Sequence, residues 1–186
     1  MEKETVIKIE KGYSSFAEEI KKDYGVFVAD CYQCGKCTAG CPVACEADVS
    51  PSQAVRMVQL GMREDLLKAK SVWLCTGCET CATRCPNGVS PAKIFDACRQ
   101  IGVKEDVPAS VPETKIMHEE ILRQVSWYGR THELGMEMLY KFRTKHFKDD
   151  MFQGLRMMLG GKISILPGRI KRPSEVAKLI KKEKSE

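Results

Sequence analysis

The stretch CYQCGKCTAGCP, from Cys31 to Pro42, repeats its cysteine spacing in CTGCETCATRCP, from Cys75 to Pro86. Both stretches read C-x2-C-x2-C-x3-C-P, which is the spacing that binds cubane iron–sulfur clusters. In proteins with two such clusters, the fourth cysteine of each run ligates the other cluster. The doubled motif therefore predicts two [4Fe–4S] clusters in one small domain.

The ligand assignment that follows is crossed between the two motifs. Three closely spaced thiolates can hold three irons of a cubane, and the fourth iron needs a thiolate from elsewhere. The proline after the fourth cysteine helps to turn the chain away from its own cluster, because it fixes φ and lacks an amide hydrogen. Crossing places the clusters close together, so the simplest role is an electron relay without catalytic residues of its own. We expect cluster 1 to be bound by Cys31, Cys34, Cys37 and Cys85, and cluster 2 by Cys75, Cys78, Cys81 and Cys41.

Two other uses of cysteine explain this pattern less well. A zinc ion takes four ligands, often as two C-x2-C pairs, and needs neither the third cysteine nor the fourth before proline. A disulfide framework suits small secreted chains, whereas this sequence of 186 residues begins MEKETVIKIEKG, without an apolar signal segment. A non-redox zinc or iron–sulfur binding module is therefore the weakest functional hypothesis.

The composition favours a cytoplasmic protein without a membrane span or a nucleic-acid partner. No apolar run approaches the roughly 18 residues of a membrane span, and ten cysteines without a secretory signal indicate a reducing compartment. The formal net charge is +5. Each oxidised cubane with four thiolates carries about −2, so two clusters would bring the total to about +1. The cofactors thus remove most of the basic character that a nucleic-acid role would need.

Each cysteine motif is followed by Val-Ser-Pro and an apolar helical pattern. Ser50 and Ser90 suit N-caps, the prolines after them suit the first helical turn, and Gln53 completes a capping box. These helices are expected to stop at Gly61 and Gly102, with a further short helix over residues 63–70. Because each cluster loop leads into a helix, the sequence predicts a mainly α fold. We expect an α-helical ferredoxin-type domain over residues 28–102.

Extensions are expected on both sides of this domain. Residues 1–27 contain a β-like stretch from Thr5 to Ile9 and a helix over residues 15–24 that buries Phe16 and Ile20. Residues 103–186 are expected to form a helical C-terminal extension for docking to other chains, since a methionine-rich surface adapts readily to partners. The alternative for its methionine-rich part is an amphipathic helix packed on the core. The extension is expected to begin with a linker over 103–114, in which Pro108 and Pro112 act as helix breakers. A helix over 115–126 follows, with apolar residues at Ile116, Ile121, Leu122 and Val125. The remaining predicted parts are a methionine-rich amphipathic region over 132–159, an extended segment over 163–166 and a last helix from Ser174.

The remaining conspicuous side chains do not indicate a substrate site. Cys98 lies on the apolar stripe of its helix and is expected to be a buried thiol. Cys45 lies in a four-residue excess that the second repeat lacks, and we expect it not to be a ligand. Trp73, just before Cys75, is expected to pack in the core. The sequence has no glycine-rich dinucleotide motif and no P-loop. Surface or capping roles are expected for His118, His132 and His146.

The motif segments resemble the C-type iron–sulfur subunit of the soluble CoB–CoM heterodisulfide reductase of methanogens. The resemblance is carried by CYQCGKCTAGCP, by WLCTGCETCATRCP and by the Val-Ser-Pro helix openings, and it covers about residues 28–102. The tail, which includes GRTHELG from Gly129 to Gly135, is similar to that of longer members of the family.

The resemblance implies an electron-transfer subunit of an oxidoreductase complex in methanogenesis. Such a subunit passes electrons from a flavin-containing A-type partner, a flavoprotein, to a catalytic B-type partner, which reduces the mixed disulfide of coenzymes M and B. A hydrogenase or formate dehydrogenase is implied in the larger complex. The catalytic partner holds its unusual cluster through adjacent cysteines, and this chain has no Cys-Cys pair. The alternative is a two-cubane relay in a quinone-linked or hydroxy-acid-oxidising dehydrogenase complex.

Overall fold

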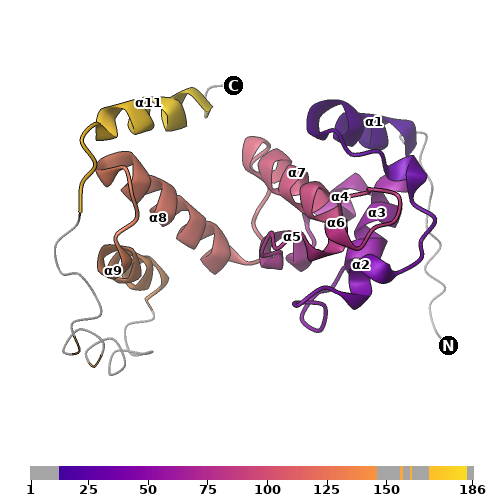
Figure 1. The fold of residues 1–186 in the computed structure, drawn as a ribbon, viewed down its shortest axis with the longest axis horizontal. Coiled ribbons are helices and arrows are strands. Elements are labelled where there is room, and N and C mark those ends of the chain that lie inside the picture. The colour runs from indigo at the N-terminus through magenta and orange to yellow at the C-terminus, as the bar shows by residue number, and fades with distance from the viewer. Residues whose placement is uncertain (1–12, 146–155, 157–159, 161–167, 184–186) are drawn as a thin grey trace. The chain divides into compact units, whose positions relative to one another are not determined.

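The protein folds into two compact helical units, residues 1–111 and residues 112–186 (Figure 1). The computed structural model describes residues 13–145, 156, 160 and 168–183. Every regular element within these residues is helical, which confirms the predicted mainly α fold class. The first unit contains α1 (Tyr13–Tyr24), η1 (Val28–Asp30), α2 (Lys36–Ala39), α3 (Pro51–Gln59), α4 (Arg63–Leu67), α5 (Lys70–Leu74), α6 (Thr80–Thr83) and α7 (Pro91–Lys104).

The two Ser-Pro helices, α3 and α7, begin as the sequence predicts. The Ser50 hydroxyl accepts a hydrogen bond from the Gln53 amide, and the Gln53 side chain accepts one from the Ser50 amide at 2.8 Å, which forms a capping box. The Ser90 hydroxyl accepts a hydrogen bond from the Lys93 amide at 3.3 Å. These caps satisfy amide groups that the first helical turn leaves without partners. They fix the residue at which each of the two helices begins after its cysteine loop.

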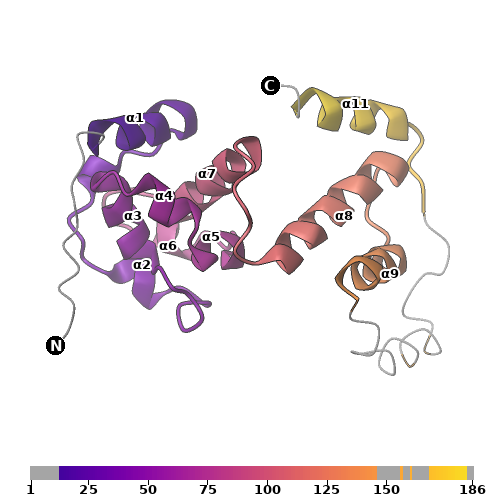
Figure 2. The same ribbon diagram turned by 180° about the vertical axis from the view of Figure 1, so that it is seen from behind.

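A single hydrophobic core holds the first unit together. Phe16 and Ile20 of α1, Trp73 of α5 and Ile94 of α7 are all buried in it, as the sequence predicted for the first three. Full burial of such a side chain contributes about 1.5–3 kcal/mol. In both ribbon views α1, α3 and α7 lie against one another, and each pair of these helices is in contact (Figure 2). The helix α1 therefore belongs to the same packed body as the cysteine loops.

The region between α3 and the second cysteine motif differs from the prediction. Instead of one helix over residues 63–70, α4 ends at Leu67 and α5 begins at Lys70. The Asp48 carboxylate starts α5, because it accepts hydrogen bonds from the amides of Lys70 at 2.7 Å and Ser71 at 2.9 Å. It also accepts one from the Ser71 hydroxyl at 2.6 Å. The cap comes from a residue 22 positions earlier in the chain, so local sequence patterns could not reveal it.

The second predicted helix stop is also wrong. Gly102 lies inside α7, which continues to Lys104. The first stop is confirmed, since α3 ends at Gln59 and Gly61 follows in a left-handed conformation. A glycine costs a helix only about 1 kcal/mol relative to alanine, so tertiary packing can carry a helix through it.

The second unit contains α8 (Pro112–Tyr128), α9 (Glu133–Thr144) and α11 (Pro173–Glu183), and α8 contacts both of the others. Pro112 was expected to break a helix but opens α8, a position where its missing amide hydrogen costs nothing. His132 caps α9 by accepting a hydrogen bond from the Gly135 amide at 3.0 Å, which confirms its predicted capping role. The last helix begins at Pro173, one residue before the predicted Ser174.

The buried face of α8 is polar, which the sequence did not predict. Glu120 and Gln124 are buried, whereas the four apolar residues noted in the predicted helix are only half-buried or exposed. Glu120 pairs with Arg143 of α9 at 2.9 Å, and the Gln124 side chain accepts a hydrogen bond from the His132 amide at 2.8 Å. The contact between α8 and α9 is therefore built on polar groups, and Oε2 of Glu120 is left without a hydrogen-bond partner among the described residues.

Several predictions concern residues outside those described. They are the β-like stretch from Thr5 to Ile9, His146, most of the methionine-rich region beyond residue 145, and the extended segment over 163–166. Among the helices that are described, none is long and apolar enough to cross a membrane.

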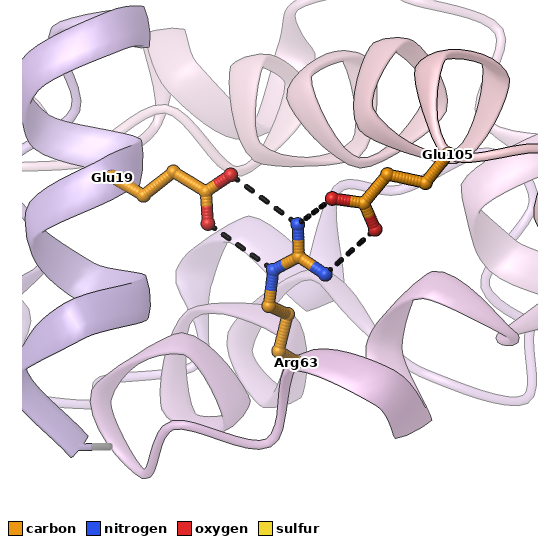
Figure 3. Close-up of polar contacts among 3 residues, drawn as sticks. All are labelled: Glu19, Arg63 and Glu105. Atoms are coloured by element: carbon orange, nitrogen blue, oxygen red, sulfur yellow. Dashed lines mark hydrogen bonds and ion pairs between the residues drawn. The ribbon is translucent and has the colours of Figure 1, made fainter.

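Arg63 links three helices of the first unit on the side of α1 (Figure 3). Its guanidinium donates to the Glu19 carboxylate of α1 at 3.2 Å and to the Glu105 carboxylate, just after α7, at 2.6 and 2.9 Å. These hydrogen bonds raise the pKa of Arg63, and the same contact lowers the pKa of Glu105. A planar guanidinium shared by two carboxylates is among the stronger surface ion pairs.

We expect Arg63→Met to lower the free energy of unfolding by about 1–2 kcal/mol, because two carboxylates lose their shared partner. Such a loss corresponds to a fall in Tm of several degrees for a domain of this size. The Tm would be followed by circular dichroism under argon at one scan rate. Lys68→Met is the matched control, because its i,i+4 pair with Glu64 is exposed and worth only about 0.3–0.5 kcal/mol. Equal effects of the two variants would contradict a structural role for the Arg63 pair.

Candidate metal centre

Each cysteine loop ends in one turn of helix that carries the third cysteine of its motif. Cys37 lies in α2 and Cys81 lies in α6, and these two short helices are in contact. The two repeats thus meet at the cysteine loops themselves. The chain continues from each turn to the fourth cysteine, Cys41 or Cys85, and then into a further turn.

The backbone of both loops takes a left-handed conformation at the same two positions. Gln33 and Gly35 have φ values of 62° and 76° in the first loop, and Gly77 and Glu79 have 65° and 57° in the second. Such residues let successive amide groups point into one concavity, which is a common way to bind phosphates and iron–sulfur clusters. Each loop supplies one of its two positions with a residue other than glycine, at a conformational cost of about 1–2 kcal/mol.

Hydrogen bonds act on the second cysteine of each loop. A hydrogen bond from the Lys36 amide lowers the pKa of Cys34. Hydrogen bonding with the Thr80 side chain and then with its amide lowers the pKa of Cys78, whose thiol donates to the Thr80 hydroxyl at 3.4 Å. Both loops therefore favour the thiolate form, which is the form that binds metals.

A pocket gathers the four cysteines predicted for cluster 2. Three of them, Cys75, Cys78 and Cys81, come from the second loop, and Cys41 comes from the first. Burial raises the pKa of Cys75 and raises that of Cys81 to about 11. The rest of the wall is mainly apolar and is formed by Pro42, Val43, Ala47, Val49, Pro51, Ala92 and Phe95, with Ser71, Thr76 and Glu79 as its polar members.

The cysteines predicted for cluster 1 are also neighbours across the two repeats. Cys31 and Cys85 both pack against the hydrophobic core. Desolvation and a hydrogen bond with Cys34 raise the pKa of Tyr32, and the charges of Cys34, Cys85 and Cys31 raise it further. Cys85 of the second repeat therefore lies beside the first loop. Burial raises the pKa of Cys37, the remaining member of the set.

Within the described residues, no three cysteine, histidine or acidic side chains converge on one point as the ligands of a single metal ion would. A zinc site needs its ligands at about 2.0–2.3 Å from one ion. In a cubane, each cysteine binds a different iron. The four cysteines around the pocket fit the second arrangement, because they surround a shared space.

The two remaining cysteines lie in opposite environments. Cys98 is 1 % exposed in the core, and burial raises its pKa to about 12, so the predicted buried thiol is confirmed. Cys45 is exposed in the turn after the first motif and is not among the residues that line the pocket.

Three polar residues that position the cysteine loops were not predicted. The Gln59 side chain donates hydrogen bonds to the carbonyls of Val28 at 2.7 Å and Cys31 at 3.3 Å. Asn87 donates to the carbonyl of Asp30, and Asp48 starts the helix that leads into Cys75. Their partners lie 22 to 57 residues away in the sequence. The only feature of the sequence that could have indicated this role of Gln59 is that a polar residue ends the apolar helix after Ser50.

These features define the class of the protein: it carries a helical domain of the iron–sulfur type with two cysteine loops, and Cys41 of the first loop reaches the pocket of the second. Residues 27–89 match the family model described as a 4Fe-4S dicluster domain. The predicted iron–sulfur chemistry is thereby confirmed, and with it the helical ferredoxin-type class.

The chain is also a relative of the C-type iron–sulfur subunits of heterodisulfide reductases, which confirms the resemblance drawn from the motifs. It is 32 % identical over 111 residues to the C-type iron–sulfur subunit of CoB–CoM heterodisulfide reductase from Methanopyrus kandleri, covering 55 % of this chain and 58 % of the relative. It is 40 % identical over 77 residues to the C-type subunit of a ferredoxin:CoB–CoM heterodisulfide reductase from Methanosarcina acetivorans, covering 41 % and 31 %. A third relative, a C-type iron–sulfur subunit of CoB–CoM heterodisulfide reductase from Methanocaldococcus jannaschii, is 35 % identical over 97 residues, covering 52 % and 50 %. The chain thus spans about half the length of the curated relatives it matches, or less.

The left-handed loop positions can be tested with two glycine substitutions. We expect Gly35→Ala to lower the free energy of unfolding by about 1–2 kcal/mol, because a Cβ is disfavoured at φ 76°. Gly102→Ala is the matched control. It lies inside α7, where a Cβ would meet nothing closer than 3.9 Å, and alanine should stabilise the helix by up to about 1 kcal/mol. The measurements are Tm and iron content of anaerobically prepared protein. If both substitutions shifted Tm in the same direction, backbone conformation would not be what constrains the loop.

Proposed function

We propose that this chain is the electron-transfer iron–sulfur subunit of a CoB–CoM heterodisulfide reductase. In this proposal it relays electrons from a flavin-containing A-type partner to a catalytic B-type partner, which reduces the CoM-S-S-CoB heterodisulfide in methanogenesis. The observation that carries the proposal is the pocket in which Cys41 joins Cys75, Cys78 and Cys81. The names of the relatives supply the pathway.

The proposed cofactors are two [4Fe–4S] clusters, each of which exchanges one electron at a time when bound. The crossed ligand sets place three thiolates of one loop and one of the other around each cluster. The donor set fits an anionic cluster, because the amides of Lys36 and Thr80 hydrogen-bond to Cys34 and Cys78. The left-handed residues of both loops are of the kind that forms anion-binding concavities. Binding requires deprotonated thiols, so loading the pocket must release protons from Cys75 and Cys81. The proposed ligands are Cys31, Cys34, Cys37 and Cys85 for cluster 1, and Cys75, Cys78, Cys81 and Cys41 for cluster 2.

The chain's own residues would orient the clusters and keep water from one of them. Phe95 and the apolar turn after Cys41 line the pocket, and Trp73 is buried just before Cys75. Exposure to solvent is one of the terms that set a cluster's potential. Gln59 and Asp48 hold the segments that enter the two loops.

Substrate chemistry is assigned to the partners. The sequence has no adjacent cysteine pair of the kind expected for the catalytic cluster of the B-type partner. We assign the second unit to docking against other chains of the complex, supported by Met138 and Phe142 of α9, which are 64 % and 73 % exposed. A larger assembly with a hydrogenase or formate dehydrogenase, in the cytoplasm, completes the proposal. A relay in a quinone-linked or hydroxy-acid-oxidising dehydrogenase is not favoured, because these three relatives are named for heterodisulfide reductase.

Serine substitutions test the crossed ligand sets. Cys85→Ser should perturb the same EPR signal as Cys34→Ser, and Cys41→Ser the same signal as Cys78→Ser, because each pair is assigned to one cluster. Each variant should lose up to about half of the bound iron. Cys45→Ser is the control and should keep the full iron content and both signals. A Cys85→Ser spectrum that matches Cys78→Ser would overturn the crossed assignment.

The proposed pathway is tested by purifying the chain anaerobically from its native source and identifying the co-purifying chains by mass spectrometry. We expect a flavoprotein and a chain with adjacent cysteines, and reduction of the heterodisulfide by the purified complex. A quinone-reactive membrane protein or a hydroxy-acid dehydrogenase in their place would refute the heterodisulfide reductase assignment while leaving the iron–sulfur relay intact.

A further inference from the structure

The helices that follow the two cysteine motifs occupy equivalent places in the two repeats. α3 contacts η1, the turn that leads into Cys31, and α7 contacts α5, the helix that leads into Cys75 (Figures 1 and 2). Both helices start with a Ser-Pro cap. Counted from Pro51 and Pro91, the last residue of α3, Gln59, corresponds to Arg99 of α7.

Gln59 shows what this position does in the first repeat. Its side chain is buried and donates hydrogen bonds to the carbonyls of Val28 and Cys31, at 2.7 and 3.3 Å. Its side-chain oxygen accepts a hydrogen bond from Arg56 at 3.1 Å. The group that holds the entry to the first loop is therefore a neutral amide.

Arg99 brings a positive charge to the same position in the second repeat. It lies one helical turn after Phe95, which lines the pocket, so both residues share a face of α7. The helix that carries it, α7, contacts α5, and α5 ends at the residue before Cys75. Its Nε is buried and has no hydrogen-bond partner in the part of the chain that the structure describes. A buried guanidinium nitrogen without an acceptor is costly unless an anion satisfies it.

We propose that the charge of Arg99 raises the reduction potential of the cluster assigned to Cys75, Cys78, Cys81 and Cys41. The inference rests on the proposed function, and it gives the two clusters different electrostatic surroundings. Uptake of one electron from the donor adds one negative charge and breaks no bond. A fixed guanidinium charge nearby stabilises that more negative state, and arginine keeps its charge at any pH relevant here.

Other charges near the loops do not cancel this difference. Lys36 follows Cys34 by two residues, Arg56 contacts Gln59, and the Arg84 side chain lies against Gly40, where an added Cβ would come within 2.7 Å of it. All three side chains are exposed, so water and salt screen their charges. Glu79 lines the same pocket as Cys75 but is also exposed. Arg99 differs from these residues because part of its guanidinium is removed from water.

The test is an anaerobic redox titration of the purified chain, followed by EPR, with the two signals assigned from the Cys34→Ser and Cys78→Ser variants. Arg99→Gln installs the residue found at the equivalent position. It should reduce the equilibrium constant for reduction of the second-loop cluster by about tenfold, which corresponds to about 59 mV for one electron. The signal of the first-loop cluster should keep its potential. Arg99→Lys retains the charge and should keep most of the wild-type potential.

A second variant makes the test independent of how well Arg99→Gln folds. Gln59→Arg keeps donors for the two loop carbonyls and adds a charge beside the first loop, so it should raise the potential of that cluster. Unchanged potentials in Arg99→Gln or in Gln59→Arg would overturn the proposal, as would an equal shift in Arg99→Lys and Arg99→Gln. These potentials belong to the isolated chain, so failure of the partner assignment would leave them unaffected.

Discussion

Cys41 leaves the first cysteine loop and enters the pocket formed by the second, and this exchange makes each repeat depend on the other. Cys85 makes the reverse move toward the first loop, where it lies near Tyr32. The helices around the loops follow from the same arrangement. α2 and α6 are in contact between the two loops, and α3 and α7 contact η1 and α5, the segments that enter the loops. A common hydrophobic core then fixes the two repeats as one body.

The exchange also gathers several thiols whose ionisation is opposed by burial. Several thiols that we propose as cluster ligands are partly buried, and burial opposes their ionisation. Backbone amides act in the opposite direction, since those of Lys36 and Thr80 hydrogen-bond to Cys34 and Cys78. The second repeat adds the fixed charge of Arg99. Such preset groups need little rearrangement when the charge of a bound cluster changes.

The second unit is stabilised differently. In its described residues, the fully buried side chains are Glu120 and Gln124, and Glu120 pairs with both Arg143 and Arg123. A buried carboxylate carries a large desolvation cost that its partners must offset. Apolar side chains such as Phe142 remain on the surface of α9. The exposed apolar side chains of α9 are the observation that supports the docking role proposed for this unit.

The sequence by itself determined the helical class, the two cysteine loops, the Ser-Pro helix starts and the burial of Cys98. Each of these follows from the local spacing of residues or from a short capping pattern, and both involve residues that are close together in the sequence. The tertiary structure alone decided where α5 begins, which residues hold the loop entries, and that α8 buries a carboxylate. Asp48, Gln59 and Glu120 act through partners 22, 31 and 23 residues away, so their roles exist only once the chain has folded. The difference between Gln59 and Arg99 combines both levels: the repeat places the two residues in register, and only packing removes part of the Arg99 guanidinium from water.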